Sequence, residues 1–147
     1  MDGAFLFLIK NSIKQFTLNK RERIKKRKEI ECLFKEGMVF NVSPLRVFYF
    51  FDRDRHSEAL EESKEKTFLK VGVGVSKRHF KKAVDRNRIK RLMREAYRLQ
   101  KLPLQNMLKE KGYYLQVFFI YTGKELPEYL LIKEKIAIVL LQLQQKI

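Results

Sequence analysis

Residues 76–101 read SKRHFKKAVDRNRIKRLMREAYRLQK, and this stretch determines how the rest of the chain is interpreted. It carries eleven lysines or arginines but only two acids, Asp85 and Glu95. With about 100° per residue on a helix, its apolar residues fall on one face, which predicts a helix that packs against a core. This apolar face consists of Ile89, Leu92, Met93, Ala96 and Tyr97. The opposite face carries Asn87, Lys90, Arg91, Arg94 and Arg98.

A cationic face of this kind is a poor solvated surface. Like charges at i, i+4 repel by ~0.2–0.5 kcal/mol per pair, whereas a solvated helix usually alternates the signs of its charges. Against phosphates the same face gains charge-assisted hydrogen bonds and counterion release. The planar fork of arginine also fits phosphate oxygens and stacks on bases. The helix therefore predicts contact with nucleic acid. A membrane is disfavoured because the apolar groups are needed to cover a sheet.

Composition supports one domain with an anionic partner. The chain has 147 residues, is 45% hydrophobic and has a net charge of +16. That charge destabilises a compact state unless an anion relieves the repulsion. The single cysteine, Cys32, excludes an intramolecular disulfide and fits a reducing cytoplasm, and we expect it to be buried on a short helix. No apolar run approaches the ~18–20 residues of a membrane span.

Hydrophobic periodicity predicts seven elements between a flexible extension at residues 1–15 and the C-terminus. A short helix runs from about residue 26 or 27 to Gly37, and a long helix over 81–101 is ended by Pro103. Strands are expected at 39–42, 45–51, 67–76 and 113–122, and a last helix from 126 or 127 to 144. Residues 16–147 then form one domain, in which 52–66 are a charged connection between strands. The order α-β-β-β-α-β-α predicts an α+β sandwich, one sheet with helices mainly on one side.

Alternation along two strands separates a core face from a more open face. In the second strand, Leu45, Val47, Tyr49 and Phe51 share the core face. The other face carries Arg46, Phe48 and Phe50. In the third strand, Gly72 and Gly74 share one face, so another group can approach the backbone closely there.

Residues 83–95, AVDRNRIKRLMRE, resemble the "RNR" signature of the bacterial ribonuclease P protein subunit. Residues 16–24, 34–37 and 72–77 are similar to further segments of that family. The resemblance runs from Phe16 to the C-terminal helix and leaves residues 1–15 and 52–66 outside it. It implies a fold like ribosomal protein S5 domain 2, with a left-handed βαβ crossover against the usual right-handed rule.

The resemblance also implies the activity. In this family a large RNA is the catalyst and removes the 5′ leader from precursor tRNA, with Mg²⁺ held mainly by that RNA and the substrate. The implied partners are ribonuclease P RNA and precursor tRNA, with no membrane and no obligate protein partner. The sequence shows no nucleophile paired with a base and no His/Cys cluster, so we expect no catalytic protein residue.

Two groups of site residues follow from the resemblance together with the pattern of charges on the helix and strand faces. The first lies on or just before the long helix and is expected to contact RNA: Lys77, Arg78, Arg86, Asn87, Arg88, Lys90, Arg91, Arg94 and Arg98. Arg86 lies nearer the apolar edge and is also a candidate for bracing the helix start. The second group is expected to form the leader-binding cleft: Ile30, Phe34, Arg46 and Phe48. Ile30 stands where the family commonly has a phenylalanine, so an apolar contact without stacking is expected at this position. Core packing remains an alternative for Ile30 and Phe34.

Three other functions stay open at this point. A ribosomal or other RNA-binding protein would have the same composition. A nucleotide-binding enzyme is suggested by Gly72-Val73-Gly74, although the third glycine of that fingerprint and a phosphate loop are missing. A DNA-binding regulator would place the basic helix in the major groove, but no helix-turn-helix or zipper pattern accompanies it.

Overall fold

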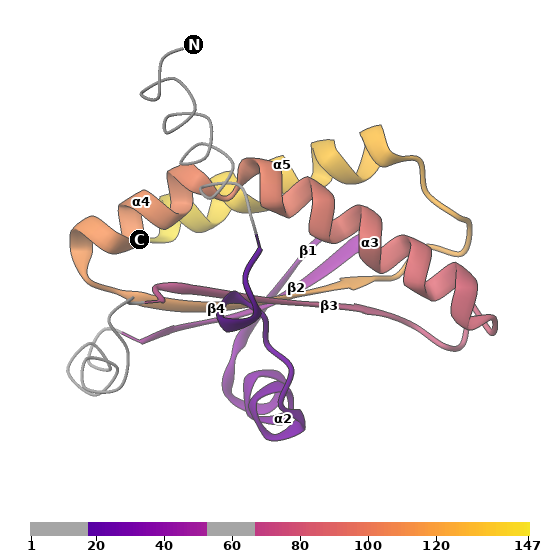
Figure 1. The fold of residues 1–147 in the computed structure, drawn as a ribbon, viewed down its shortest axis with the longest axis horizontal. Coiled ribbons are helices and arrows are strands. Elements are labelled where there is room, and N and C mark those ends of the chain that lie inside the picture. The colour runs from indigo at the N-terminus through magenta and orange to yellow at the C-terminus, as the bar shows by residue number, and fades with distance from the viewer. Residues whose placement is uncertain (1–17, 53–66) are drawn as a thin grey trace, which may run out of the picture.

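The computed structural model describes residues 18–52 and 67–147 (Figure 1). The predicted extension at residues 1–15, residues 16–17 and all but Asp52 of the charged connection lie outside the described residues. The elements are η1 (Lys20–Glu22), α2 (Arg27–Glu36), β1 (Met38–Val42), β2 (Leu45–Asp52), β3 (Leu69–Val75), α3 (Ala83–Gln100), α4 (Leu102–Lys111), β4 (Tyr114–Tyr121) and α5 (Tyr129–Lys146).

The four strands form one sheet in the order β1-β2-β4-β3. β2 is antiparallel to both β1 and β4, whereas β3 is parallel to β4. α3 and α4 form the crossover that joins this parallel pair. Helices α3, α4 and α5 cover one face of the sheet, and α2 lies on the other (Figure 1). This arrangement confirms the predicted α+β sandwich with helices mainly on one side.

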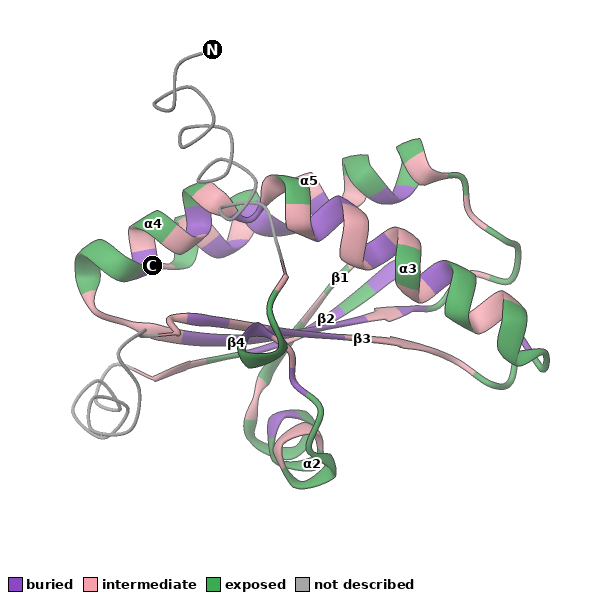
Figure 2. Cartoon of the chain, viewed as in Figure 1, coloured by how far each residue is buried: buried purple, intermediate pink, exposed green. Residues whose placement is uncertain are grey.

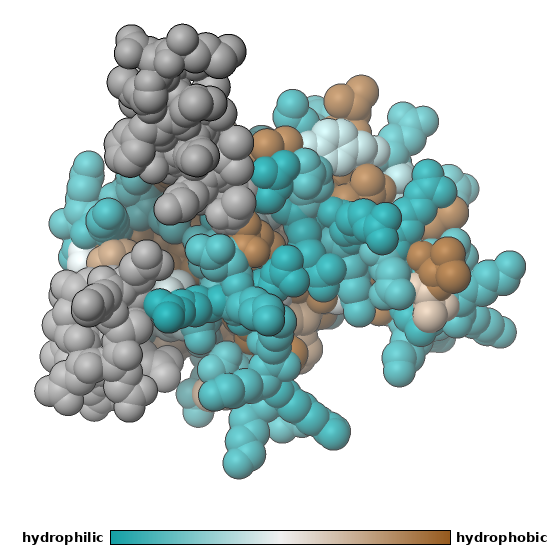
Figure 3. Space-filling model, in the orientation of Figure 1, coloured by the Kyte–Doolittle hydropathy of each residue, from teal (hydrophilic) through white to brown (hydrophobic). Residues whose placement is uncertain are grey.

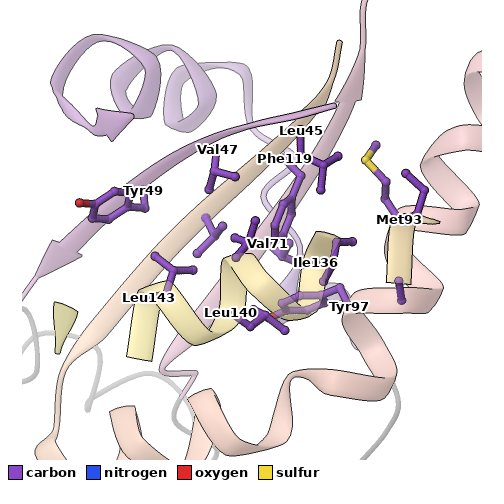
Figure 4. Close-up of a cluster of buried hydrophobic side chains, with 14 of the residues drawn as sticks. Leu45, Val47, Tyr49, Val71, Met93, Tyr97, Phe119, Ile136, Leu140 and Leu143 are labelled. Carbon is purple, nitrogen blue, oxygen red and sulfur yellow. The ribbon is translucent and has the colours of Figure 1, made fainter. Parts of the chain in front are cut away.

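The core lies between the sheet and the α3/α5 layer (Figure 4). Leu45, Val47 and Tyr49 are buried at alternate positions of β2, as the two-residue period of a strand requires. The apolar stripe of α3 meets them, with Ile89, Met93 and Tyr97 buried. α5 adds Ile132, Ile136, Val139, Leu140 and Leu143. Figure 2 shows the buried side of α3 facing the sheet.

The face under α2 explains the two glycines of β3. A Cβ at Gly72 would lie 2.3 Å from Phe118 Cδ2, and one at Gly74 would lie 3.0 Å from Phe118 Cε1. The group that approaches the backbone is therefore an aromatic ring of the chain itself. Both glycines lie inside β3 rather than in a turn before a helix, which disfavours the nucleotide-binding alternative.

Helix α4 was not predicted. Pro103 was expected beyond the end of the long helix, but it lies in the first turn of α4, where its missing N–H costs no helical hydrogen bond. α4 ends at Gly112, whose φ of 69° is the left-handed conformation that glycine adopts readily.

The predicted burial of Cys32 was wrong. Cys32 is exposed, and its thiol donates to Glu36 Oε2 at 3.6 Å, because Leu33 and Ile30 form the buried side of α2. On α5, Leu130, Leu131 and Leu141 are exposed, Leu130 by 72%. Among the described residues, no helix combines the length and apolarity needed to span a bilayer.

Candidate nucleic-acid interface

The start of α3 is fixed by Arg86. Its Nη1 donates to the carbonyls of Phe80 and Lys81, both at 2.8 Å. These bonds satisfy carbonyl groups in the turn that leads into the helix, so Arg86 braces the helix start as the sequence suggested. In the turn itself Lys77 and Arg78 are exposed, and the Arg78 N–H donates to Ser76 Oγ at 3.3 Å.

Most of the cationic face of α3 is not neutralised. In the described ranges 18–52 and 67–147, no carboxylate lies within ion-pair distance of any of four cations on this helix: Arg88, Lys90, Arg91 and Arg94. Asn87, Arg88 and Arg91 are exposed, and Lys90 and Arg94 are half-buried. These side chains keep their charges available for an external anion.

Arg98 is the exception on this face. Its Nη2 lies 2.6 Å from Glu95 Oε1, and its Nε donates to Glu95 Oε2 at 3.2 Å. The hydrogen bond from Arg98 lowers the pKa of the Glu95 carboxyl, and the same bond raises the pKa of Arg98. Arg98 is therefore neutralised within the helix, because Glu95 lies three residues before it.

Residues 18–26, which we call the N-terminal strap, join the helical layer to α2. The strap passes the β3 edge of the sheet (Figure 1), where the Ile24 N–H donates to the Val71 carbonyl at 2.8 Å and Arg23 forms a parallel bridge with Val71. Leu18 packs against the main core. A strongly cationic segment is thereby placed between α3 and α2.

Glu22 anchors the strap from within. Its carboxylate accepts hydrogen bonds from Lys101 Nζ at 2.9 and 3.0 Å and from Gln105 Nε2 at 3.2 Å. The Asn19 backbone N–H donates to it at 2.9 Å. The Lys101 side chain is 2% exposed and that of Glu22 is 12% exposed. Burial, together with the charge of Glu22, raises the pKa of the Tyr97 phenol well above its usual value. Glu22 is thus committed to the interior, and no carboxylate of the described residues lies within ion-pair distance of its neighbours Arg21 and Arg23.

The charge of Arg23 in the strap acts on Arg94 of α3. Burial first, and then the charge of Arg23, lower the pKa of the Arg94 guanidinium. Arg23 Nε is buried without a hydrogen-bond partner in the part of the chain that the structure describes. Two guanidinium groups that repel each other and have no described carboxylate beside them suit an anion with several acceptor oxygens. Sequence analysis did not single out Arg23, although it lies among the seven cations of residues 19–28.

The four cleft residues come together on the α2 side of the sheet. The rings of Phe34 and Phe48 lie 4.5 Å apart, and Arg46 Cζ lies 5.4 Å from the centre of the Phe48 ring. Ile30 is half-buried against the cluster formed by Ile24, Leu33 and Phe118, whereas Phe34 remains 39% exposed. We call Ile30, Phe34, Arg46 and Phe48 the aromatic cleft.

Phe118 is a member of this site that sequence analysis missed. Its ring packs edge-on against Phe34 with the centroids 5.0 Å apart. β4 is apolar at nearly every position, so no alternation shows which of its side chains face α2. The contact gives Phe34 a fixed neighbour while part of its ring stays exposed.

The strap connects the two surfaces. On the face seen in Figure 3, hydrophilic side chains cover the strap and much of α3. The geometry defines a class of protein: a small α+β sandwich in which the described carboxylates leave a cationic surface unneutralised beside an aromatic cleft.

The chain belongs to the ribonuclease P protein family. Residues 18–138 match the family described as Ribonuclease P. The ribonuclease P protein component of Porphyromonas gingivalis is 40% identical over 114 residues, covering 78% of this chain and 77% of that protein. The corresponding protein of Chlorobium phaeobacteroides is 33% identical over 129 residues, covering 82% and 84%.

Solved structures support the fold. The ribonuclease P protein of Staphylococcus aureus matches with a TM-score of 0.59 at 22% identity, over 84% of this chain and 94% of that one. The ribonuclease P protein of Thermotoga maritima matches with a TM-score of 0.57 at 22% identity, over 83% and 97%.

Proposed function

We propose that this chain is the RNA-binding protein subunit of ribonuclease P. It binds the catalytic RNA and the 5′ leader of precursor tRNA, and it promotes endonucleolytic removal of the leader at physiological Mg²⁺ in the cytoplasm. The observation that carries the proposal is the set of cations on α3 and the strap that the described carboxylates do not neutralise. Membership of the family supports it independently.

The two surfaces have different parts in this proposal. Cations along α3 and the strap displace counterions from RNA phosphates, a sequence-independent gain in affinity. The aromatic cleft takes bases of the single-stranded leader, because an exposed ring beside a cation binds unpaired bases by stacking and charge. The proposal assigns Mg²⁺ mainly to the RNA subunit and the substrate, as the resemblance to the family implies.

Reconstitution tests this function directly. The full chain is mixed with the cognate ribonuclease P RNA and precursor tRNA at low Mg²⁺, and release of the 5′ leader is measured. We expect leader removal at Mg²⁺ concentrations where the RNA alone is slow. Equal rates with and without the protein would contradict the proposal. Co-sedimentation with ribosomal subunits instead of this RNA would favour the ribosomal alternative.

Replacing Phe34 with alanine is expected to weaken binding of leader-bearing tRNA to the reconstituted complex by about 1–3 kcal/mol, the contribution of one stacked base. Mature tRNA has no leader and should bind nearly as before. The two dissociation constants are measured in parallel. Phe51→Ala, on the core face of β2, is the control, because it weakens packing without touching the cleft. An equal loss for both tRNAs would show that Phe34 only stabilises the core.

A further inference from the structure

A second groove lies between α2 and the sheet, on the flank of α2 opposite the aromatic cleft. It encloses a cavity of about 240 Å³, lined by Lys28, Glu29, Cys32, Glu36, Phe50 and Gln116. On a helix with about 100° per residue, Lys28, Cys32 and Glu36 share one flank of α2. Ile30 and Phe34, which form the cleft, share the other. Leu33 is buried between the two flanks.

The sheet supplies the floor of this second groove. Phe50, Gln116 and Lys70 lie in one row across β2, β4 and β3. The next row on the same face holds Phe48 and Phe118, so the floor of the second groove borders the floor of the aromatic cleft. The Phe50 ring is 38% exposed and offers a flat apolar surface. Lys70 Nζ lies 3.8 Å from Glu29 Oε1, which ties the row to α2.

The polar groups of the second groove are mainly acceptors. The carboxylates of Glu29 and Glu36 accept hydrogen bonds and cannot donate them when ionised. Gln116 is buried, and its Nε2 already donates to the Tyr114 hydroxyl at 3.1 Å, which leaves its carbonyl oxygen for a ligand. The carboxylate of Glu36, which pairs with no cation among the described residues, disfavours a phosphate in the interior of the groove. A flat group that donates N–H bonds fits it, and the exposed Lys28 at the rim suits the phosphate that follows such a group.

We propose that the second groove is a base subsite for single-stranded RNA and selects bases with an exocyclic amino group over uracil. Adenine, cytosine and guanine place an amino group toward the acceptors while stacking on Phe50, whereas uracil presents two carbonyls and a single N–H. A cavity of this size lies below the usual ~300–1,000 Å³ of ligand pockets and matches one base. The inference rests on the proposed function, because it assumes that the RNA-binding face includes this side of α2.

The first test compares two labelled oligonucleotides, ten-residue oligo(A) and oligo(U), bound to the full chain and measured by fluorescence anisotropy at fixed salt. We expect Phe50→Ala to weaken oligo(A) binding roughly tenfold, the effect of losing one stacking platform, and oligo(U) binding much less. Phe34→Ala is the matched control and should weaken both oligonucleotides alike. The inference is overturned if Phe50→Ala leaves oligo(A) binding unchanged or weakens both by the same factor. Equal thermal unfolding midpoints verify that the variants fold.

A second variant tests the acceptor chemistry without removing the ring. Glu36→Gln keeps the shape of the side chain but adds a donor, so the preference for oligo(A) over oligo(U) should shrink. Glu31→Gln, on the exposed side of α2, should leave the preference unchanged. Free adenosine should compete with oligo(A) for the parent chain but not for Phe50→Ala. Inorganic phosphate should affect oligo(A) binding equally in the parent chain and in Phe50→Ala. An unaltered preference in Glu36→Gln contradicts the subsite.

These readouts are separate from the proposed function. Binding of ribonuclease P RNA to Phe50→Ala and Glu36→Gln should equal that of the parent chain, because neither residue lies on α3 or the strap. Failure of the parent chain to bind that RNA would reject the proposed function. Loss of the oligo(A) preference while that RNA still binds would reject only the base subsite.

Discussion

Replacing Lys101 with methionine is expected to lower the free energy of unfolding by about 3–5 kcal/mol, because it leaves a buried carboxylate without its cation. Lys101 Nζ lies 2.9 Å from Glu22 Oε2 and has almost no contact with solvent. The remaining partners of Glu22 are the Gln105 amide and the Asn19 N–H, and neither carries a charge. Urea denaturation followed by circular dichroism measures the change.

The double variant Glu22→Leu/Lys101→Met distinguishes the effect of an unpaired buried charge from a general loss of packing. Replacing a buried pair by apolar groups of similar volume is often nearly neutral, so the double variant should be more stable than Lys101→Met alone. Lys111→Met is the surface control. The exposed Lys111 ammonium donates to the Ile147 carbonyl at 3.1 Å, so the change should stay within about 0.5 kcal/mol. A Lys101→Met protein as stable as the parent would contradict the anchoring role of Glu22.

The anchor also has a functional consequence. Glu22 holds the strap so that Arg23 lies beside Arg94. If Lys101→Met releases the strap, binding of ribonuclease P RNA should weaken even though Lys101 is buried and cannot contact RNA. This positioning effect was not accessible from the sequence, because 79 residues separate Glu22 from Lys101 and no local pattern links them.

Other parts of the fold could be predicted from the sequence, because buried residues recur at the regular spacing of a strand or a helix. The core face of β2 and the apolar stripe of α3 were predicted correctly, since each element has one buried side. β4 lies between two strands and is covered on both faces, so its continuous apolar run concealed the contact of Phe118 with Phe34. Proline is common both just after the end of a helix and in the first turn of a new helix, so the sequence around Pro103 did not distinguish these two positions. Glu95 and Arg98 have the i, i+3 spacing of an ion pair, but this pair was not predicted because the helix face was interpreted as a whole from its excess of cations.

Replacing Arg91 and Arg94 together with alanine is expected to weaken binding of ribonuclease P RNA about 100-fold or more at low salt, since each hydrogen bond to a charged group contributes ~1.5–3 kcal/mol. The logarithm of the binding constant should also fall less steeply with the logarithm of salt concentration. Its slope should decrease by about two, because each of the two arginines neutralises one phosphate in the parent complex. Titrations between roughly 50 and 200 mM salt measure this slope.

Arg98→Ala provides the matched control on the same helix face. Its guanidinium already pairs with Glu95 at 2.6 Å, so removing it deletes a largely neutralised pair and should change the slope less than Arg91→Ala does. Arg94 should have the larger single effect, because it is half-buried beside Arg23 and a desolvated cation gains more from an anion than an exposed one. An unchanged slope in the double variant, or equal slopes for Arg98→Ala and Arg91→Ala, would show that the unneutralised cations of α3 do not contact phosphate.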